Sequence, residues 1–103
     1  KRVAIARALA IDPGIIFYDE PTSELDPVTA VAIGKEIRRV NKEHGTTSII
    51  VTHDRDLAFG IADTITFMAQ GRLTDPQTPD EIRSLSDPQT RQFLHAGSQK
   101  DYL

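Results

Sequence analysis

Two short, mainly apolar runs stand out in the hydrophobic pattern of the chain, Ile15 to Tyr18 (IIFY) and residues 48–52 (SIIVT). Runs of this length are typical of strands buried on both faces, as in a parallel sheet. Residues 64–68 (TITFM) predict a third strand. The Gln70-Gly71 pair then predicts a turn, after which Arg72-Leu73 can return as the second arm of a hairpin.

Helices are predicted before and between these runs. Residues 1–10 (KRVAIARALA) are rich in strong helix formers. Asp26-Pro27 is a favourable helix start, with Asp as the N-cap and Pro at the first position, and Gly45 is a favourable stop. Asp54 predicts the cap of a third helix. The second helix is predicted to have an apolar face formed by Ala30, Ile33, Ile37 and Val40. The apolar face of the third helix is predicted to be Leu57 and Ile61. The alternation of helix and strand predicts an α/β fold with a parallel sheet and flanking helices.

The last quarter of the chain has a different pattern. Residues 75–79 are polar and contain two prolines, and Thr78 to Glu81 form a capping-box sequence that predicts a short helix through Leu85. Asp87-Pro88 predicts another short helix, which carries Phe93 and Leu94 and ends at Gly97. We therefore expect a main domain over residues 1–75 and a C-terminal helical tail over residues 76–103.

Composition narrows the class of protein. The 103 residues carry a formal net charge of −3, which gives no indication of a nucleic-acid partner. The chain has no cysteine, so it has neither a disulfide framework nor a thiolate metal site. No apolar run approaches the roughly 18 residues of a membrane span. Because the chain opens inside a helical pattern without a cap or an initiating methionine, we expect it to be the C-terminal part of a longer protein.

Candidate chemistry follows the two strongest strands. Asp19 and Glu20 end the first apolar run, and His53 follows the second. Ligands of open α/β sheets bind beyond the carboxyl ends of strands, so these side chains are expected to converge. One carboxylate could hold Mg²⁺ and the other could polarise a water that attacks a phosphate. His53 could stabilise the developing charge. The competing interpretation is plain structure, because acids at a strand end are often caps or turn residues.

The order and spacing of these motifs resemble the C-terminal half of an ATP-binding-cassette (ABC) ATPase, a P-loop NTPase. Residues 1–10 resemble the helix after the LSGGQ signature, residues 15–19 resemble Walker B, and Glu20 resembles the catalytic glutamate. Residues 21–26 (PTSELD) resemble the D-loop, and residues 51–54 (VTHD) resemble the switch-histidine loop. Glu24 departs from the Ala or Gly that is common in the family.

The resemblance implies a mechanism and partners. Asp19 would coordinate Mg²⁺, Glu20 would polarise the attacking water, and His53 would contact the γ-phosphate of ATP. Ser23 and Asp26 would lie in the D-loop, where Asp26 would couple two ATP sites across a head-to-tail dimer with a second ATP-binding subunit. Transmembrane permease subunits would hold this dimer at the cytoplasmic side of the inner membrane.

The tail is similar to one branch of the family. Residues 78–97 (TPDEIRSLSDPQTRQFLHAG) resemble the ending of cassettes in the Mla/Mkl phospholipid-transport branch, which implies lipid transport and possible lipid-binding partner proteins. For Phe93 and Leu94, simple packing onto the domain competes with pairing to a partner subunit.

Several features of the family do not occur in the 103 residues. The chain contains no GxxxxGK[ST] and no LSGGQ, and its sheet is expected to lack the P-loop strand and to expose apolar edges. Two alternatives to a transporter subunit therefore stay open. One is a truncated interaction fragment without activity, and the other is part of a non-transport ABC ATPase.

Overall fold

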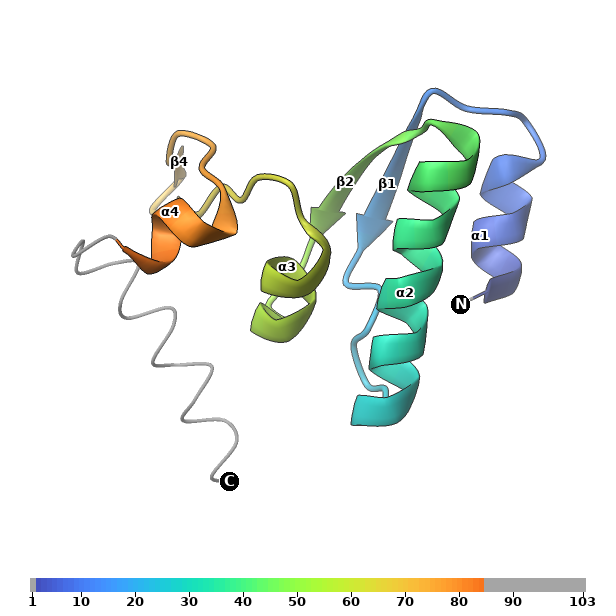
Figure 1. Cartoon of the computed structure of the whole chain (residues 1–103), viewed down its shortest axis with the longest axis horizontal. Coiled ribbons are helices and arrows are strands. Elements are labelled where there is room, and N and C mark those ends of the chain that lie inside the picture. The colour runs from blue at the N-terminus through green and yellow to red at the C-terminus, as the bar shows by residue number, and fades with distance from the viewer. Residues whose placement is uncertain (1, 85–103) are drawn as a thin grey trace. The chain divides into compact units, whose positions relative to one another are not determined.

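A computed structural model describes residues 2–84 of the chain, with side chains described from residue 4 onward (Figure 1). The chain divides into two compact units, the first ending at Ile61 and the second beginning at Ala62. Each unit is described by itself. The predicted domain boundary after residue 75 stays a prediction.

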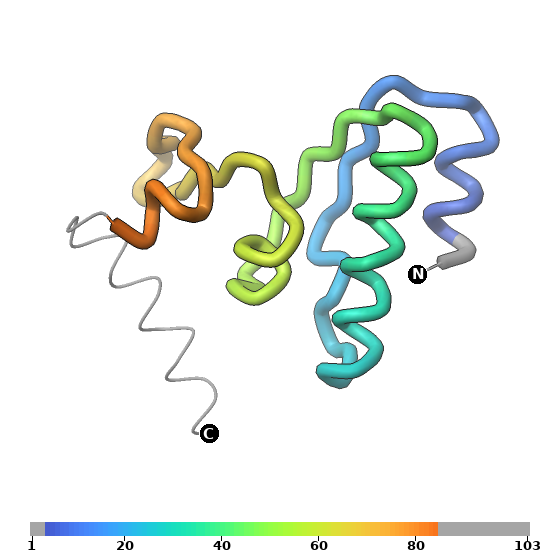
Figure 2. Tube along the Cα trace, in the orientation of Figure 1, coloured from blue at the N-terminus to red at the C-terminus, as the bar shows by residue number. Residues whose placement is uncertain are grey.

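The first unit contains three helices and a two-stranded parallel sheet. Its elements are α1 (Arg2–Leu9), β1 (Ile15–Asp19), α2 (Pro27–His44), β2 (Thr47–Val51) and α3 (Arg55–Ile61). Strands β1 and β2 are parallel neighbours, paired from Ile15 with Thr47 to Asp19 with Val51. This pairing confirms the predicted parallel neighbours, and the trace in Figure 2 shows α2 as the connection between them. Both strands therefore end at the same edge of the sheet.

Helix α2 begins and ends at the predicted residues. The Asp26 carboxylate accepts a hydrogen bond from the Thr29 backbone N–H at 3.0 Å, and Pro27 occupies the first helical position. Gly45 ends the helix in the left-handed conformation, at φ 64°, and its N–H donates to the Asn41 carbonyl at 3.0 Å. A residue with a Cβ is strained in this conformation, which accounts for glycine at the stop.

The core lies on one face of the sheet, beneath α1 and α2. It is formed by Ile5 of α1, by Ile16 and Tyr18 of β1, and by Ile33, Ile37 and Val40 of α2. Helix α3 packs against α2, where the absence of a side chain on Gly34 admits Leu57. A Cβ at Gly34 would lie 3.0 Å from Cδ1 of Leu57.

In the part of the chain that the structure describes, no helix covers the opposite face of the sheet, which corrects the prediction of strands buried on both faces. Successive side chains of a strand point to opposite faces, and both covering helices pack on the Ile16 face. Phe17 is consequently 72% exposed, and Ile15, Ile49 and Val51 are exposed beside it.

The second unit contains a short hairpin and a helix. Strands β3 (Met68–Ala69) and β4 (Arg72–Leu73) are antiparallel and joined by Gln70 and Gly71, both at positive φ. Two positive φ values are typical of the type I′ turn, and the arrangement confirms the predicted hairpin. Helix α4 (Pro79–Arg83) has the predicted Thr78–Glu81 capping box. It ends before the predicted limit at Leu85, which lies outside the described residues, as does the helix expected after Asp87.

The third predicted strand, residues 64–68, is wrong. Ile65 forms an isolated antiparallel bridge with Gln77, with backbone N···O distances of 2.7 and 3.1 Å in the two directions. Met68 belongs to the hairpin. The β-forming residues of this segment therefore pair within the second unit, and in the described part of the chain the parallel sheet has two strands. Across that same part, no helix combines the length and apolar character needed to cross a membrane.

Candidate functional site

The candidate site begins where β1 and β2 end. Asp19 is paired with Val51, and the Glu20 N–H donates to the Val51 carbonyl at 2.7 Å, which extends the pairing one step beyond the strand. Glu20 adopts φ 49°, in the left-handed region. This conformation turns the chain sharply at Glu20, between the end of β1 and the loop that leads to α2.

Glu20 and His53 are brought into direct contact, as the sequence predicted for the groups beyond these two strands. Nδ1 of His53 lies 2.5 Å from Oε1 of Glu20, and the backbone N–H of His53 donates to Oε2 at 3.4 Å. With the carboxylate as acceptor, Nδ1 carries the donated proton and Nε2 is left for another partner. The His53 side chain is 81% exposed, whereas that of Glu20 is 30% exposed. The pair can therefore meet a ligand arriving from solvent.

Asp19, which was expected to converge with these two residues, is not part of their hydrogen-bonded contact. As the last residue of β1 it is exposed, in register with Val51 and on the same open face as Phe17. In the described residues no group of three or more His, Cys, Asp or Glu side chains could hold a metal ion by itself. Mg²⁺ keeps several waters and commonly uses one or two carboxylates together with substrate phosphates, so a single exposed Asp19 carboxylate is compatible with it.

Ser23 and Asp26 lie in the loop that leads from Glu20 to α2. The Ser23 N–H donates to the Glu20 carbonyl at 3.2 Å, and the Ser23 side chain is exposed. Asp26 caps α2 and also accepts the Thr29 hydroxyl at 2.6 Å. The Thr29 side-chain hydrogen bond, supported by the backbone N–H of Thr29, lowers the pKa of Asp26. Neither side chain contacts Glu20 or His53, and the predicted roles of both in a dimer stay predictions.

Sequence reasoning missed one contact of the site, between Thr22 and Asp54. The Thr22 hydroxyl donates to Oδ2 of Asp54 at 2.7 Å, and Thr22 is buried. Asp54 was expected only as the cap of α3, a role that its Oδ1 fills by accepting the Leu57 N–H at 3.1 Å. The strand register offered a signal: Asp19 pairs with Val51, and Thr22 and Asp54 each lie three residues further on.

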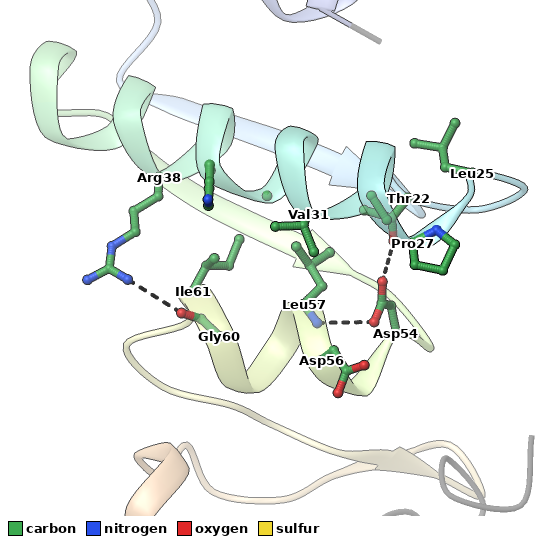
Figure 3. A pocket seen from close by; sticks show the side chains of 13 residues that line it. Thr22, Leu25, Pro27, Val31, Arg38, Asp54, Asp56, Leu57, Gly60 and Ile61 are labelled. Carbon is green, nitrogen blue, oxygen red and sulfur yellow. Dashed lines mark hydrogen bonds between the residues drawn. The ribbon is translucent and has the colours of Figure 1, made fainter. Parts of the chain in front are cut away.

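A pocket of about 520 Å³ lies between α2 and α3 and reaches this contact (Figure 3). Leu57, Ile61 and Val31 point into it from the two helices, and the Thr22–Asp54 hydrogen bond lies at one end. Arg38 reaches across to the Gly60 carbonyl at 3.5 Å. The pocket is therefore an apolar groove with charged side chains at its rim.

Comparisons with known proteins give a consistent result. No family model matches the chain. Over 97 residues it is 42% identical to the probable amino-acid ABC transporter ATP-binding protein y4tH of Sinorhizobium fredii, covering 93% of the chain and 38% of that protein. It is 40% identical over 104 residues to the L-cystine import ATP-binding protein TcyN of Bacillus subtilis, covering 100% of the chain and 39% of that protein. It is also 45% identical over 82 residues to the Fe(3+) ions import ATP-binding protein FbpC 2 of Rhizobium meliloti, covering 80% of the chain and 21% of that protein.

Solved structures similar to this chain are also ABC ATPases. The structure of cbiO1 from Clostridium perfringens, part of the ABC transporter complex cbiONQ, has a TM-score of 0.74 and 38% identity, covering 81% of the chain and 33% of that protein. The ATP-binding cassette MJ0796, a dimer in a post-hydrolysis state bound to ADP and Pi, has a TM-score of 0.66 and 38% identity, covering 76% of the chain and 33% of that protein. The chain thus has the α/β fold of ABC ATPase domains, as predicted, and spans less than two-fifths of the length of these relatives.

Proposed function

We propose that the chain is the C-terminal part of the ATP-hydrolysing subunit of an ABC transporter and carries the residues that activate water. The contact between Glu20 and His53 at the carboxyl edge of a parallel sheet is the observation that carries this proposal. The two residues come from loops 33 positions apart in the sequence. Relatives named as ATP-binding subunits and a neighbour bound to ADP and Pi support the same reaction.

Each residue has a distinct chemical role in this proposal. The Glu20 carboxylate accepts a proton from water as the oxygen attacks the γ-phosphate of ATP. With a proton on each ring nitrogen, His53 holds that carboxylate through Nδ1–H and donates Nε2–H to the developing negative charge. Asp19 would hold Mg²⁺, an ion that neutralises phosphate charge when bound. Ser23 and Asp26 belong to the loop that would face a second subunit.

The partners follow from the same proposal. The neighbour MJ0796 is dimeric, and cbiO1 is part of a transporter complex. We propose a second ATP-binding subunit as one partner and membrane-embedded permease subunits as the other, which would place the protein on the cytoplasmic face of the inner membrane. The names of the relatives compared above do not support the alternative of a non-transport ABC ATPase.

The transported substrate is proposed from the names of the relatives. They give amino acids, L-cystine and Fe(3+), which favour import of a small polar solute. The phospholipid branch rests on the tail sequence over residues 78–97, and these relatives do not support it. Uptake of labelled amino acids or Fe(3+) by the reconstituted transporter supports the solute, whereas transfer of labelled phospholipid supports the lipid branch.

The catalytic proposal is tested by substituting Glu20→Gln in the full-length protein. The amide keeps the size of the side chain but cannot act as a base, so ATP binding should persist while hydrolysis falls by about 100-fold or more. Glu43→Gln is the matched control, because Glu43 is an exposed glutamate in the last turn of α2, away from this loop. Hydrolysis by Glu20→Gln within a few-fold of the control would show that Glu20 is not the base.

A further inference from the structure

The contact between Glu20 and His53 cannot hold its own geometry firmly. The His53 side chain is 81% exposed, and ion pairs or charged hydrogen bonds at such positions are screened by water and contribute little stability. Misplacing a reacting group by about 1 Å can nevertheless cost about 100-fold in rate. The pairing of β1 and β2, extended by the Glu20 N–H on the Val51 carbonyl, fixes where the two loops begin, so a further interaction is needed to hold the loops beyond that point.

The Thr22–Asp54 hydrogen bond has the properties required. It joins the same two loops, from a residue two positions after Glu20 to the residue directly after His53. Its donor is buried, and its acceptor is a carboxylate, which makes charge-assisted hydrogen bonds stronger than neutral ones. The bond is therefore better protected from water than the Glu20–His53 pair.

One end of this bond is fixed to helix α3 and the other to a turn of the loop that carries Glu20. Asp54 receives the Leu57 N–H on Oδ1, and its own N–H donates to the Thr52 hydroxyl at 2.9 Å. On the other loop, the Thr22 carbonyl accepts the Leu25 N–H at 3.3 Å. The two oxygens of the Asp54 carboxylate thus accept hydrogen bonds from different elements, Oδ1 from helix α3 and Oδ2 from the loop of Glu20.

We infer that Thr22 and Asp54 are positioning residues that lock the loop of Glu20 to the loop of His53 in the geometry needed for hydrolysis. Neither touches the reacting atoms, and both act through Glu20. The inference rests on the proposed function, which assigns the reaction to Glu20.

The test uses Thr22→Val in the full-length protein, because valine keeps the shape of threonine and removes only the hydroxyl. Thr46→Val is the matched control. Thr46 is the other buried threonine of the described residues, its hydroxyl donates to Oδ1 of Asn41 at 3.2 Å, and it lies just before β2, at the opposite end of the sheet. A general loss of stability should affect both variants alike.

The lock predicts a kcat for Thr22→Val about 10- to 100-fold below that of Thr46→Val, with KM for ATP within about threefold of it. Thr22→Ser, which restores the hydroxyl, should recover most of the rate. In a Glu20→Gln background, Thr22→Val should produce no further loss. Equal kcat for the two valine variants, or an undiminished loss in the Glu20→Gln background, would overturn the inference.

Hydrogen exchange separates this inference from the proposed function. Backbone amides of residues 52–54 should exchange faster in Thr22→Val than in Thr46→Val, whether or not Glu20 is the base. If Glu20→Gln leaves hydrolysis intact, the proposed function fails, and the exchange comparison still decides whether the loops are locked. Equal exchange in the two variants would show that they are not.

Discussion

Nδ1 of His53 lies 2.5 Å from Oε1 of Glu20, which makes the two side chains a single unit at the edge of the sheet. Each residue comes directly or nearly directly after a strand, so the parallel pairing of β1 and β2 produces the contact. Substitutions in this pair should change activity, whereas substitutions in α2, the helix between β1 and β2, should change stability.

Replacing His53 should impair hydrolysis through Glu20. His53→Ala removes both the support of the carboxylate and the imidazole that faces the phosphate, so phosphate release at saturating ATP should fall by about 10- to 1,000-fold. Adding Glu20→Gln should cause little further loss, because residues that act as a unit are not additive. His44→Ala, an exposed histidine at the end of α2, is the control. Additive losses in the double variant would show that the two residues work separately.

The 103-residue chain alone should neither bind nor hydrolyse ATP. P-loop proteins hold phosphates through backbone N–H groups and a lysine of GxxxxGK[ST], and this chain contains no such sequence. Asp19 and Glu20 are negative and repel a triphosphate in the absence of those donors. Calorimetry with Mg-ATP is the measurement, and micromolar affinity would contradict this account of the binding groups.

The Asp26 cap should make the stability of α2 depend on pH. Hydrogen bonds from the Thr29 side chain and backbone lower the pKa of Asp26 below its ordinary value of 3.8. A group whose pKa is depressed by folding contributes stability above its unfolded value, and loses it as the pH falls through the folded value. Asp26→Asn keeps an acceptor without the charge. Its melting temperature should therefore lie a few degrees below wild type at pH 7, with a smaller difference near pH 3. An unchanged difference would exclude the carboxylate charge as the cause.

Two apolar positions of α2 should differ sharply in their importance for folding. Ile37 is 1% exposed in the core, so Ile37→Ala should destabilise the chain by about 2–5 kcal/mol through lost burial and a cavity. Val28→Ala is the comparison, because Val28 is 79% exposed on the same helix and should change stability by less than about 0.5 kcal/mol. Urea unfolding of both variants measures the difference. Similar losses would mean that the core is not where the buried side chains indicate.

Features that depend on a few neighbouring residues, such as helix caps and stops, could be predicted from the sequence. Asp26-Pro27 and Gly45 satisfy the ends of α2 by themselves, and the Thr78–Glu81 box does the same for α4. The closeness of Glu20 and His53 also followed, because it requires only that two apolar runs form parallel neighbours. These signals depend on few residues and on no distant partner.

Contacts between residues far apart in the sequence were harder to predict. Residues 64–68 have strong β-forming character, but Ile65 pairs with Gln77, and nothing in the local sequence specified that choice. The apolar runs likewise could not reveal that one face of the sheet is open in this chain. The Thr22–Asp54 contact required the register of β1 on β2, which the pairing of whole strands decides.

The left-handed conformation of Glu20 sets catalysis against folding. Its φ of 49° costs a residue with a Cβ roughly 1–2 kcal/mol relative to glycine, and Glu24 adopts the same region at φ 64°. Glu20→Gly and Glu24→Gly should therefore both raise the melting temperature, and only Glu20→Gly should abolish hydrolysis. Under the proposed function, the more stable protein at position 20 would be the inactive one, so selection for stability alone would remove the carboxylate and only selection for turnover would retain it.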